Sequence, residues 1–129
     1  MRIYLTGGAG FIGSNLVRAL LSGGHDVMVV DDLSTGHVEN LDPRAGFRKL
    51  DILGEEMAEH MAEFRPDAVV HLAAQSSVTV SIADPERDRA VNAEGTRRIA
   101  AAAREAGALR VISASSAAVY GEPAELSCW

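Results

Sequence analysis

Three regularly spaced glycines near the N-terminus could bind a phosphate group. Gly7, Gly10 and Gly13 stand between residues 2–6, whose apolar run predicts a strand, and residues 12–22, which predict a helix. At such a turn the exposed backbone N–H groups and the positive end of the helix dipole favour an anion such as pyrophosphate. Glycines also serve tight turns and close packing, so the spacing alone leaves a purely structural role open.

A carboxylate follows the next predicted strand. The uninterrupted apolar run 27–30 predicts a strand buried on both faces, and it ends at Asp31, eighteen residues after Gly13. An acidic side chain at that place can accept hydrogen bonds from the adenosine ribose hydroxyls of a dinucleotide. It would repel a 2′-phosphate, so the position favours NAD over NADP. A solvated strand end is the alternative for Asp31 and its neighbour Asp32.

The elements that must position these residues alternate between strands and helices. Apolar runs predict strands at 2–6, 27–30, 46–50, 67–72 and 109–113, and longer patterns predict helices at 12–22, 54–64 and 84–106. This alternation predicts an α/β, Rossmann-like, three-layer fold around a parallel sheet, with the strand order 3-2-1-4-5 given by right-handed crossovers. The sixth strand of such a sheet is missing, so the fold is expected to be truncated. In the first helix, Leu16, Ala19 and Leu20 are expected to share the buried face.

Composition limits the classes of function. A chain of 129 residues with 47% hydrophobic side chains suits one domain, and its net charge of −6 opposes a nucleic-acid partner. The only cysteine, Cys128, favours a reducing compartment and hence the cytoplasm. The first five residues are too short an apolar run for a signal peptide or a membrane span. The four histidines have no metal-ligand spacing with one another or with Cys128, so no metal is expected.

Five further segments complete a pattern that resembles the extended short-chain dehydrogenase/reductase family, and within it the NAD-dependent epimerases and dehydratases. The segments are Asp31-Asp32-Leu33-Ser34-Thr35-Gly36, Asp51-Ile52, His71-Leu72-Ala73-Ala74-Gln75, Val91-Asn92-Ala93-Glu94-Gly95-Thr96 and Ser115-Ser116-Ala117-Ala118-Val119-Tyr120-Gly121.

That resemblance implies NAD as the cofactor and a set of residues that bind it. Asp51 and Ile52 would flank the adenine, the segment 72–75 would line the middle of the cofactor, and Asn92 would reach it from the long helix. Small residues packed under a helix are the alternative for 72–74, an exposed helix position for Asn92, and a satisfied strand-end histidine for His71. The implied cofactor-binding residues are Gly7, Gly10, Phe11, Ile12, Gly13, Asp31, Asp32, Ser34, Thr35, Gly36, Asp51, Ile52, Leu72, Ala73, Ala74, Gln75 and Asn92.

The resemblance also assigns a catalytic role to Ser116, which would hydrogen-bond a sugar hydroxyl while a tyrosinate accepts its proton. A polar residue at a strand end is the alternative. Dehydratases of the family usually have acids at the two positions after this serine, where this chain has Ala117 and Ala118. Together with the segment 75–85, this favours the nucleotide-sugar 4-epimerases, which oxidise the sugar C4 transiently.

The family's catalytic base is a tyrosine followed four residues later by a lysine, and this sequence lacks the pair. Tyr4 is followed by Gly8 and Tyr120 by Ala124, while the only lysine is Lys49. The resemblance implies that the family's substrate-binding region is absent too. We therefore expect residues 1–129 to form an NAD-binding domain that is inactive alone. A non-catalytic or regulatory NAD-binding module is the alternative.

A homodimer is expected because the fifth strand would have a bare outer edge. Leu109, Val111 and Ile112 are apolar, and no proline blocks strand pairing there. Self-association through this edge or through the C-terminal tail would cover it. Further apolar residues that could help to bury the contact are Val119, Tyr120, Leu126 and Trp129.

Overall fold

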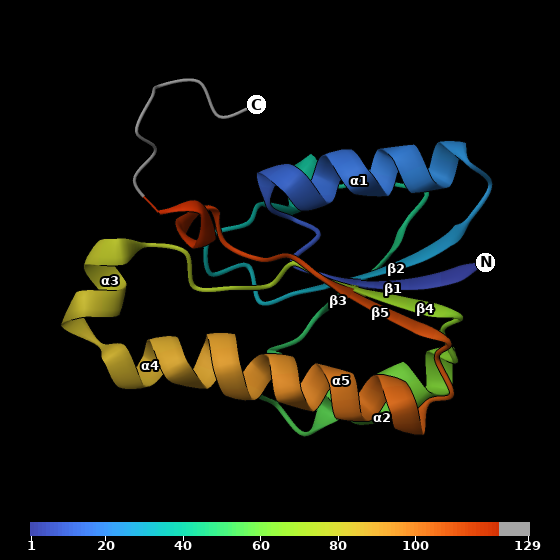
Figure 1. Cartoon of the computed structure of the whole chain (residues 1–129). Coiled ribbons are helices and arrows are strands. Elements are labelled where there is room, and N and C mark those ends of the chain that lie inside the picture. The colour runs from blue at the N-terminus through green and yellow to red at the C-terminus, as the bar shows by residue number, and fades with distance from the viewer. Residues whose placement is uncertain (122–129) are drawn as a thin grey trace.

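A five-stranded sheet lies between two layers of helices in the computed structural model, which describes residues 1–121 (Figure 1). All strands are parallel and lie in the order β3-β2-β1-β4-β5. Helix α1 (Phe11–Ser22) covers one face, and helices α2 (Glu56–Phe64) and α5 (Thr96–Glu105) cover the other. The predicted three-layer fold and strand order are confirmed. The strands are β1 (Arg2–Thr6), β2 (Asp26–Asp31), β3 (Gly46–Lys49), β4 (Ala68–His71) and β5 (Arg110–Ser113).

The central strand β1 contributes side chains to both cores because successive residues point to opposite faces. Ile3 and Leu5 belong to the core cluster that contains Val17 of α1. Tyr4 belongs to the opposite cluster, with Met61 of α2. Burial on both faces explains why β1 and β2 read as continuous apolar runs rather than as alternating patterns.

The buried face of α1 differs from the expected one. Val17 is fully buried, whereas Ala19 is exposed and Leu16 and Leu20 are only partly buried. The helix starts directly at the glycine turn and packs against it at Gly13, which has no side chain. Val17 follows Gly13 by four residues and therefore lies on the same face of the helix. The placement of Ala19 on the buried face was therefore wrong.

The long helix predicted over 84–106 is present but is not uniform. Helix α4 (Pro85–Arg89) begins at Asp84, whose carboxylate accepts a hydrogen bond from the Arg87 N–H, and a π-helical turn over Ala90–Gly95 leads into α5. Such π-helical turns are frequent at functional sites. Within residues 1–121, none of the helices combines the length and the apolar character that crossing a bilayer requires.

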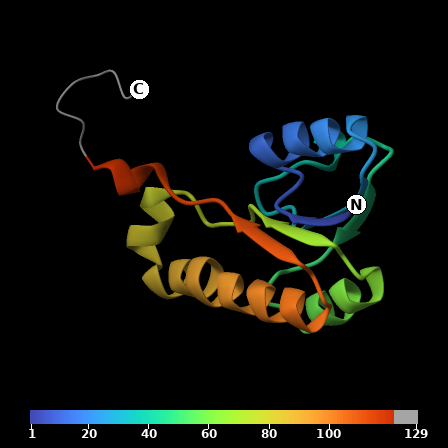
Figure 2. The same ribbon diagram turned by 45° about the vertical axis from the view of Figure 1, so that its right-hand side comes forward.

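Two short elements lie beyond the carboxyl ends of the strands and were not predicted. They are helix α3 (Val78–Ala83) and a 3₁₀ turn over Ala117–Tyr120 (Figures 1 and 2). The Ser77 hydroxyl caps α3 by accepting from the Val80 N–H. The β-branched residues of α3 disfavour a helix by local propensity, which explains the omission.

Candidate functional site

The glycine turn between β1 and α1 is held so tightly that two of its glycines cannot be replaced. Gly7 has a φ of +74°, and a Cβ added to it would lie 2.5 Å from the backbone nitrogen of Ala73. A Cβ on Gly13 would collide with the carbonyl oxygen of Gly7. These two glycines therefore bring the turn against the end of β4 and bring α1 against the turn.

Gly10 differs, because its surroundings are open. Its φ of −77° suits any residue, and among the described residues the only atom within 4 Å of an added Cβ is the Gly7 carbonyl oxygen, at 3.6 Å. Gly10 is also the N-cap of α1, and no described side chain caps that helix. The first N–H groups of α1 thus lie beside open space, as an anion site requires. Phe11 and Ile12 follow at 84% and 67% exposure.

Asp31, at the end of β2, is fixed against this turn. Its side chain is almost fully buried, with Oδ2 accepting from the Ala9 N–H at 2.9 Å and Oδ1 from the Leu33 N–H at 2.9 Å. Ala9 is held on its other side as well, since its carbonyl oxygen accepts from the His37 N–H and from Asn40 Nδ2. The carboxylate and the glycine turn are thereby fixed relative to each other.

The segment after β2 wraps around the same turn. Asp32, Ser34 and Thr35 are exposed, with the Ser34 N–H donating to Asp32 Oδ1. Gly36 is buried, and a Cβ added to it would lie 2.8 Å from the Ala9 Cβ. The structure thus brings the predicted residues of segment 31–36 next to the glycine turn.

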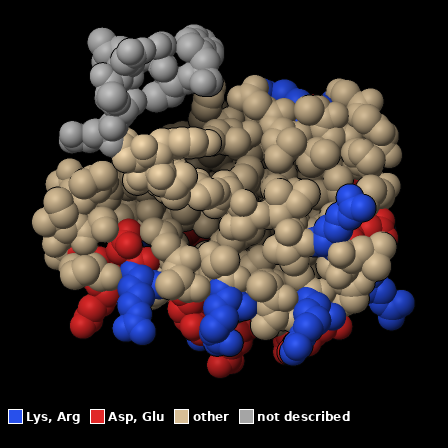
Figure 3. Space-filling view, viewed as in Figure 1, with Lys and Arg blue, Asp and Glu red and all other residues tan. Residues whose placement is uncertain are grey.

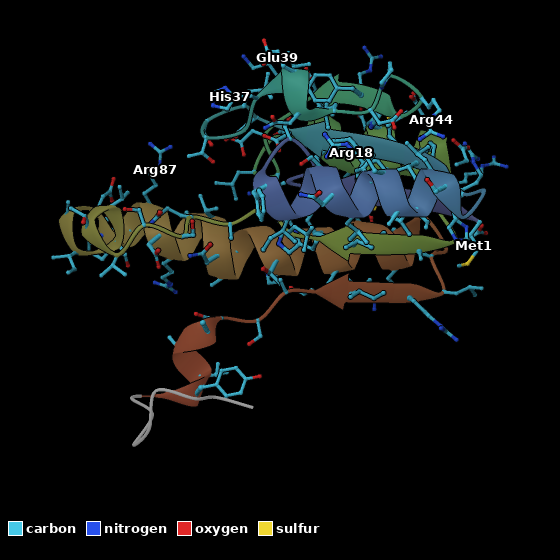
Figure 4. All side chains as sticks on the ribbon, turned by 90° about the horizontal axis from the view of Figure 1, so that it is seen from above. Met1, Arg18, His37, Glu39, Arg44 and Arg87 are labelled. Carbon is cyan, nitrogen blue, oxygen red and sulfur yellow. The ribbon has the colours of Figure 1, made fainter. Side chains whose placement is uncertain are left out.

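A side chain of α1 secures the far end of this loop. Arg18 donates from Nη2 to the Asn40 carbonyl oxygen at 3.0 Å, and Figure 4 shows it on α1 beside the loop that carries His37 and Glu39. Because Asn40 also binds Ala9, the loop is tied to both the helix and the turn.

Asp51 and Ile52 follow β3 at the same edge of the sheet but differ in exposure. The Leu50 N–H donates to the Asp31 carbonyl oxygen, which joins this segment to the end of β2. Asp51 is exposed and its Oδ1 accepts from the Leu53 N–H. The Ile52 side chain is 6% exposed and belongs to the core. Only the backbone of Ile52 could therefore contact a ligand at this surface.

A cavity of about 550 Å³ lies beyond the ends of β4 and β5. It adjoins the glycine turn, because Gly7 packs against the backbone of Leu72 and Ala73. The predicted site residues therefore form two neighbouring groups, one at the ends of β1, β2 and β3 and one around this cavity. The predicted residues that line the cavity are Leu72, Ala73, Ala74, Gln75, Asn92 and Ser116.

The Asn92 side chain, which projects from the π-helical turn, clamps the cavity wall. Its Oδ1 accepts from the Gln75 N–H at 2.9 Å, and its Nδ2 donates to the Gln75 carbonyl oxygen at 2.9 Å and to Asp88 Oδ1 at 3.1 Å. Both amide hydrogens are therefore bound within the protein. Asn92 is partly buried, so the exposed helix position considered as its alternative is wrong.

His71 is a buried hydrogen-bonding residue at the end of β4. Its Nδ1 lies 2.7 Å from Thr6 Oγ1 and its Nε2 lies 3.1 Å from Thr96 Oγ1. Because the Thr96 hydroxyl donates to the Asn92 carbonyl oxygen, it must accept from His71 Nε2–H, which leaves Nδ1 to accept from Thr6. Burial lowers the pKa of His71, in agreement with this neutral form. Both ring nitrogens are satisfied, as the strand-end interpretation requires.

Ser116 is exposed on the cavity wall. Its Oγ accepts from the Ala118 N–H at 3.2 Å, so its hydroxyl can still donate to a ligand oxygen. Within residues 1–121, no group of three or more His, Cys, Asp or Glu side chains could hold a metal ion.

The two tyrosines and the single lysine lie apart. Tyr4 is fully buried, its hydroxyl is hydrogen-bonded with His60 Nδ1 at 2.9 Å, and burial raises its pKa. Tyr120 is 81% exposed after β5, whereas Lys49 belongs to β3 at the opposite edge of the sheet. Neither tyrosine is placed with a lysine to act as a base.

Comparison with known proteins decides the family. Residues 3–127 match the model of the NAD-dependent epimerase/dehydratase family. The chain belongs to this family. The resemblance inferred from its motifs is therefore confirmed.

Individual members of the epimerase/dehydratase family show how much of their length this chain matches. The UDP-glucose 4-epimerase of Mycolicibacterium smegmatis is 48% identical over an alignment 129 residues long. The alignment covers 95% of this chain and 41% of that protein. The structure of UDP-glucose 4-epimerase with UDP-glucose from Thermotoga maritima aligns with a TM-score of 0.89 and 42% identity, covering 98% of this chain and 41% of that one. The structure of the Thermus thermophilus UDP-glucose 4-epimerase in complex with NAD aligns with a TM-score of 0.82 and 43% identity, covering 86% of this chain and 36% of that one. The chain spans about 40% of the relatives it matches.

One residue that lines the cavity of this chain was not identified from the sequence. Asp88 lines the cavity and binds both Gln75 and Asn92 through Oδ1. Its position four residues before Asn92 puts the two on one face of a helix, which was the signal available in the sequence.

Proposed function

We propose that this chain is the NAD-binding domain of a nucleotide-sugar epimerase of the UDP-glucose 4-epimerase type. The observation that carries the proposal is the uncapped start of α1 at the open Gly10, directly beside the buried carboxylate of Asp31. These features lie at the carboxyl ends of the strands, where the sheet order changes direction between β1 and β4. The similar epimerases that bind NAD and UDP-glucose support it.

The two halves of NAD would contact different groups of residues. The first N–H groups of α1 would bind the pyrophosphate, and Asp31 would accept from the adenosine ribose hydroxyls, with Asp51 nearby. The other half would then extend across Ala73 into the cavity beyond β4 and β5. There Ser116 would donate to a sugar hydroxyl. Bound NAD supplies the acceptor for the hydride that leaves the sugar C4.

We propose that the chain by itself binds NAD without turnover. Oxidation at C4 requires a base to take the hydroxyl proton, and the 129 residues contain no tyrosine with a lysine four positions later. Residues 1–129 would thus form one NAD-binding domain. A regulatory NAD-binding module would use the same cofactor residues. The cytoplasmic location inferred from the lone Cys128 is likewise a proposal.

Asp31→Asn is expected to raise the Kd for NAD by about tenfold and the Kd for NADP by less. The substitution removes the charge that would receive the ribose hydroxyls and repel a 2′-phosphate. It also loses one of the two bonds from the Ala9 and Leu33 N–H groups, which affects both cofactors, so the ratio of the two Kd values reports the charge. Calorimetry with both cofactors measures the effect. Asp26→Asn is a matched control, because Asp26 lies exposed at the opposite end of β2. Equal or tighter binding of NADP by the unmodified chain would contradict the role of Asp31.

We also propose a homodimer formed through β5. Among the described strands β5 pairs only with β4, and Figure 4 shows it at the margin of the sheet. All its residues are exposed, including Val111 at 44% and Ile112 at 56%. Val119 and Tyr120, in the turn after β5, are also exposed, at 68% and 81%. An unprotected edge of this kind favours pairing with a second copy across a two-fold axis. The earlier candidates Leu126 and Trp129 lie outside the described residues.

Ile112→Pro is expected to convert the dimer to a monomer in light scattering. Successive N–H groups along a strand point to opposite sides. Because the Leu109 N–H donates to the Asp67 carbonyl oxygen, on the side of β4, the Val111 N–H also points toward β4 and the Ile112 N–H points outward. Ile112→Val keeps the N–H group and should remain dimeric. Deletion of 122–129 separates the contribution of the tail. A monomer at high concentration, or a dimer unaffected by both changes, would refute the proposal.

A further inference from the structure

The cavity beyond β4 and β5 has a single charged side chain. Of its lining residues, all of them within the described part of the chain, only Asp88 is an acid, a lysine or an arginine. Figure 3 shows many charged side chains along the edge formed by α4 and α5, and fewer at the top and on the right-hand side of this face. Asp88 is therefore the one charged group on the wall of this cavity, as far as the structure describes the chain.

The Asp88 carboxylate is fixed by neutral donors rather than neutralised by a cation. Its Oδ1 accepts from Gln75 Nε2 and from Asn92 Nδ2, each at 3.1 Å. These amides hold the carboxylate in place and leave its negative charge uncompensated. The side chain is partly buried, so water screens the charge less than it would at the surface.

The geometry of the site determines which part of a dinucleotide meets this charge. Asp31 and Asp51 lie on the side of β2 and β3, and the open Gly10 marks the place for the pyrophosphate. Since the turn at Gly7 contacts Ala73, the half that carries the nicotinamide continues toward the cavity. The nicotinamide ring is a cation in oxidised NAD and neutral in NADH.

We propose that Asp88 makes the cavity selective for oxidised NAD over NADH. A fixed negative charge in a partly shielded cavity attracts the cationic ring and has no such effect on the neutral one. The inference rests on the proposed NAD-binding function and adds to it a residue that sets the preferred redox state of the cofactor.

The test compares the Kd values of the two redox states. Asp88→Asn keeps the shape of the side chain and an oxygen that accepts from Gln75 and Asn92, so the cavity wall is retained. It is expected to raise the Kd for oxidised NAD, measured by calorimetry, by about fivefold and to leave the Kd for NADH, measured by its fluorescence, unchanged. Asp88→Glu should keep the preference of the unmodified chain.

Glu86→Gln is the matched control on the same helix. Glu86 lines a different surface hollow, together with Arg89 and Arg97, so removal of its charge should leave both Kd values unchanged. An equal loss of both redox states in Asp88→Asn would show that Asp88 only supports the wall, and an unchanged ratio would show no electrostatic role. Either result overturns the inference. If the unmodified chain bound neither form, the proposed function itself would fail.

Discussion

Replacement of Gly10 by alanine is expected to weaken NAD binding by about tenfold or more while the fold stays intact. The backbone of Gly10 has an ordinary φ, and the nearest described atom to the new Cβ would be 3.6 Å away, so alanine fits without strain. The methyl group would instead occupy the space in front of the first N–H groups of α1. A pyrophosphate would lose its close approach to these donors.

The control for Gly10→Ala lies at the other end of the same helix. Gly23 has a φ of −79°, and a Cβ there would meet its nearest atoms at 3.4 Å, so Gly23→Ala should leave NAD binding unchanged. Calorimetry gives the Kd, and thermal unfolding followed by circular dichroism confirms that both variants are folded. NAD binding by Gly10→Ala at the strength of the unmodified chain would show that the turn is not the pyrophosphate site.

The parts of the fold that the sequence predicted well are those with a local physical cause. Strands β1 and β2 lie between two helical layers and are buried on both faces, so their sequences are unbroken apolar runs. Gly7 and Gly13 are required by backbone contacts within and beside the turn, so they appear as a fixed spacing. Asp31 could be located because it follows directly from the end of such a run.

The details that the sequence could not show depend on packing between distant segments. Asn92 binds the backbone of Gln75 across 17 residues, through a π-helical turn that no local pattern announces. Ile52 turns inward because Gly95 leaves room for it: a Cβ on Gly95 would lie 2.6 Å from Ile52 Cδ1. The motif therefore identified these positions but could not show which of their atoms face a ligand.

His71→Leu is expected to lower the free energy of unfolding by about 3 kcal/mol, because two buried hydrogen bonds are lost and their partners stay behind. The histidine joins Thr6, directly before the glycine turn, to Thr96 and through it to the Asn92 carbonyl oxygen. Its loss therefore loosens the turn and the cavity wall together. We expect weaker NAD binding in this variant as a second effect, measured by calorimetry.

The pH dependence of stability identifies the contribution of His71 itself. Burial lowers its pKa from the ordinary 6.5 in the folded chain, so below about pH 6.5 the unfolded chain takes up a proton that the folded chain does not. The contribution of neutral His71 is fully present above that pH and is lost as the pH falls. His60, whose pKa is lowered mainly by burial, acts in the same direction. Urea unfolding between about pH 7.5 and about pH 5.5 should therefore show a smaller loss of stability in His71→Leu than in the unmodified chain. Equal losses would mean that the pKa of His71 does not change on folding. The histidine would then support the site only through its packing.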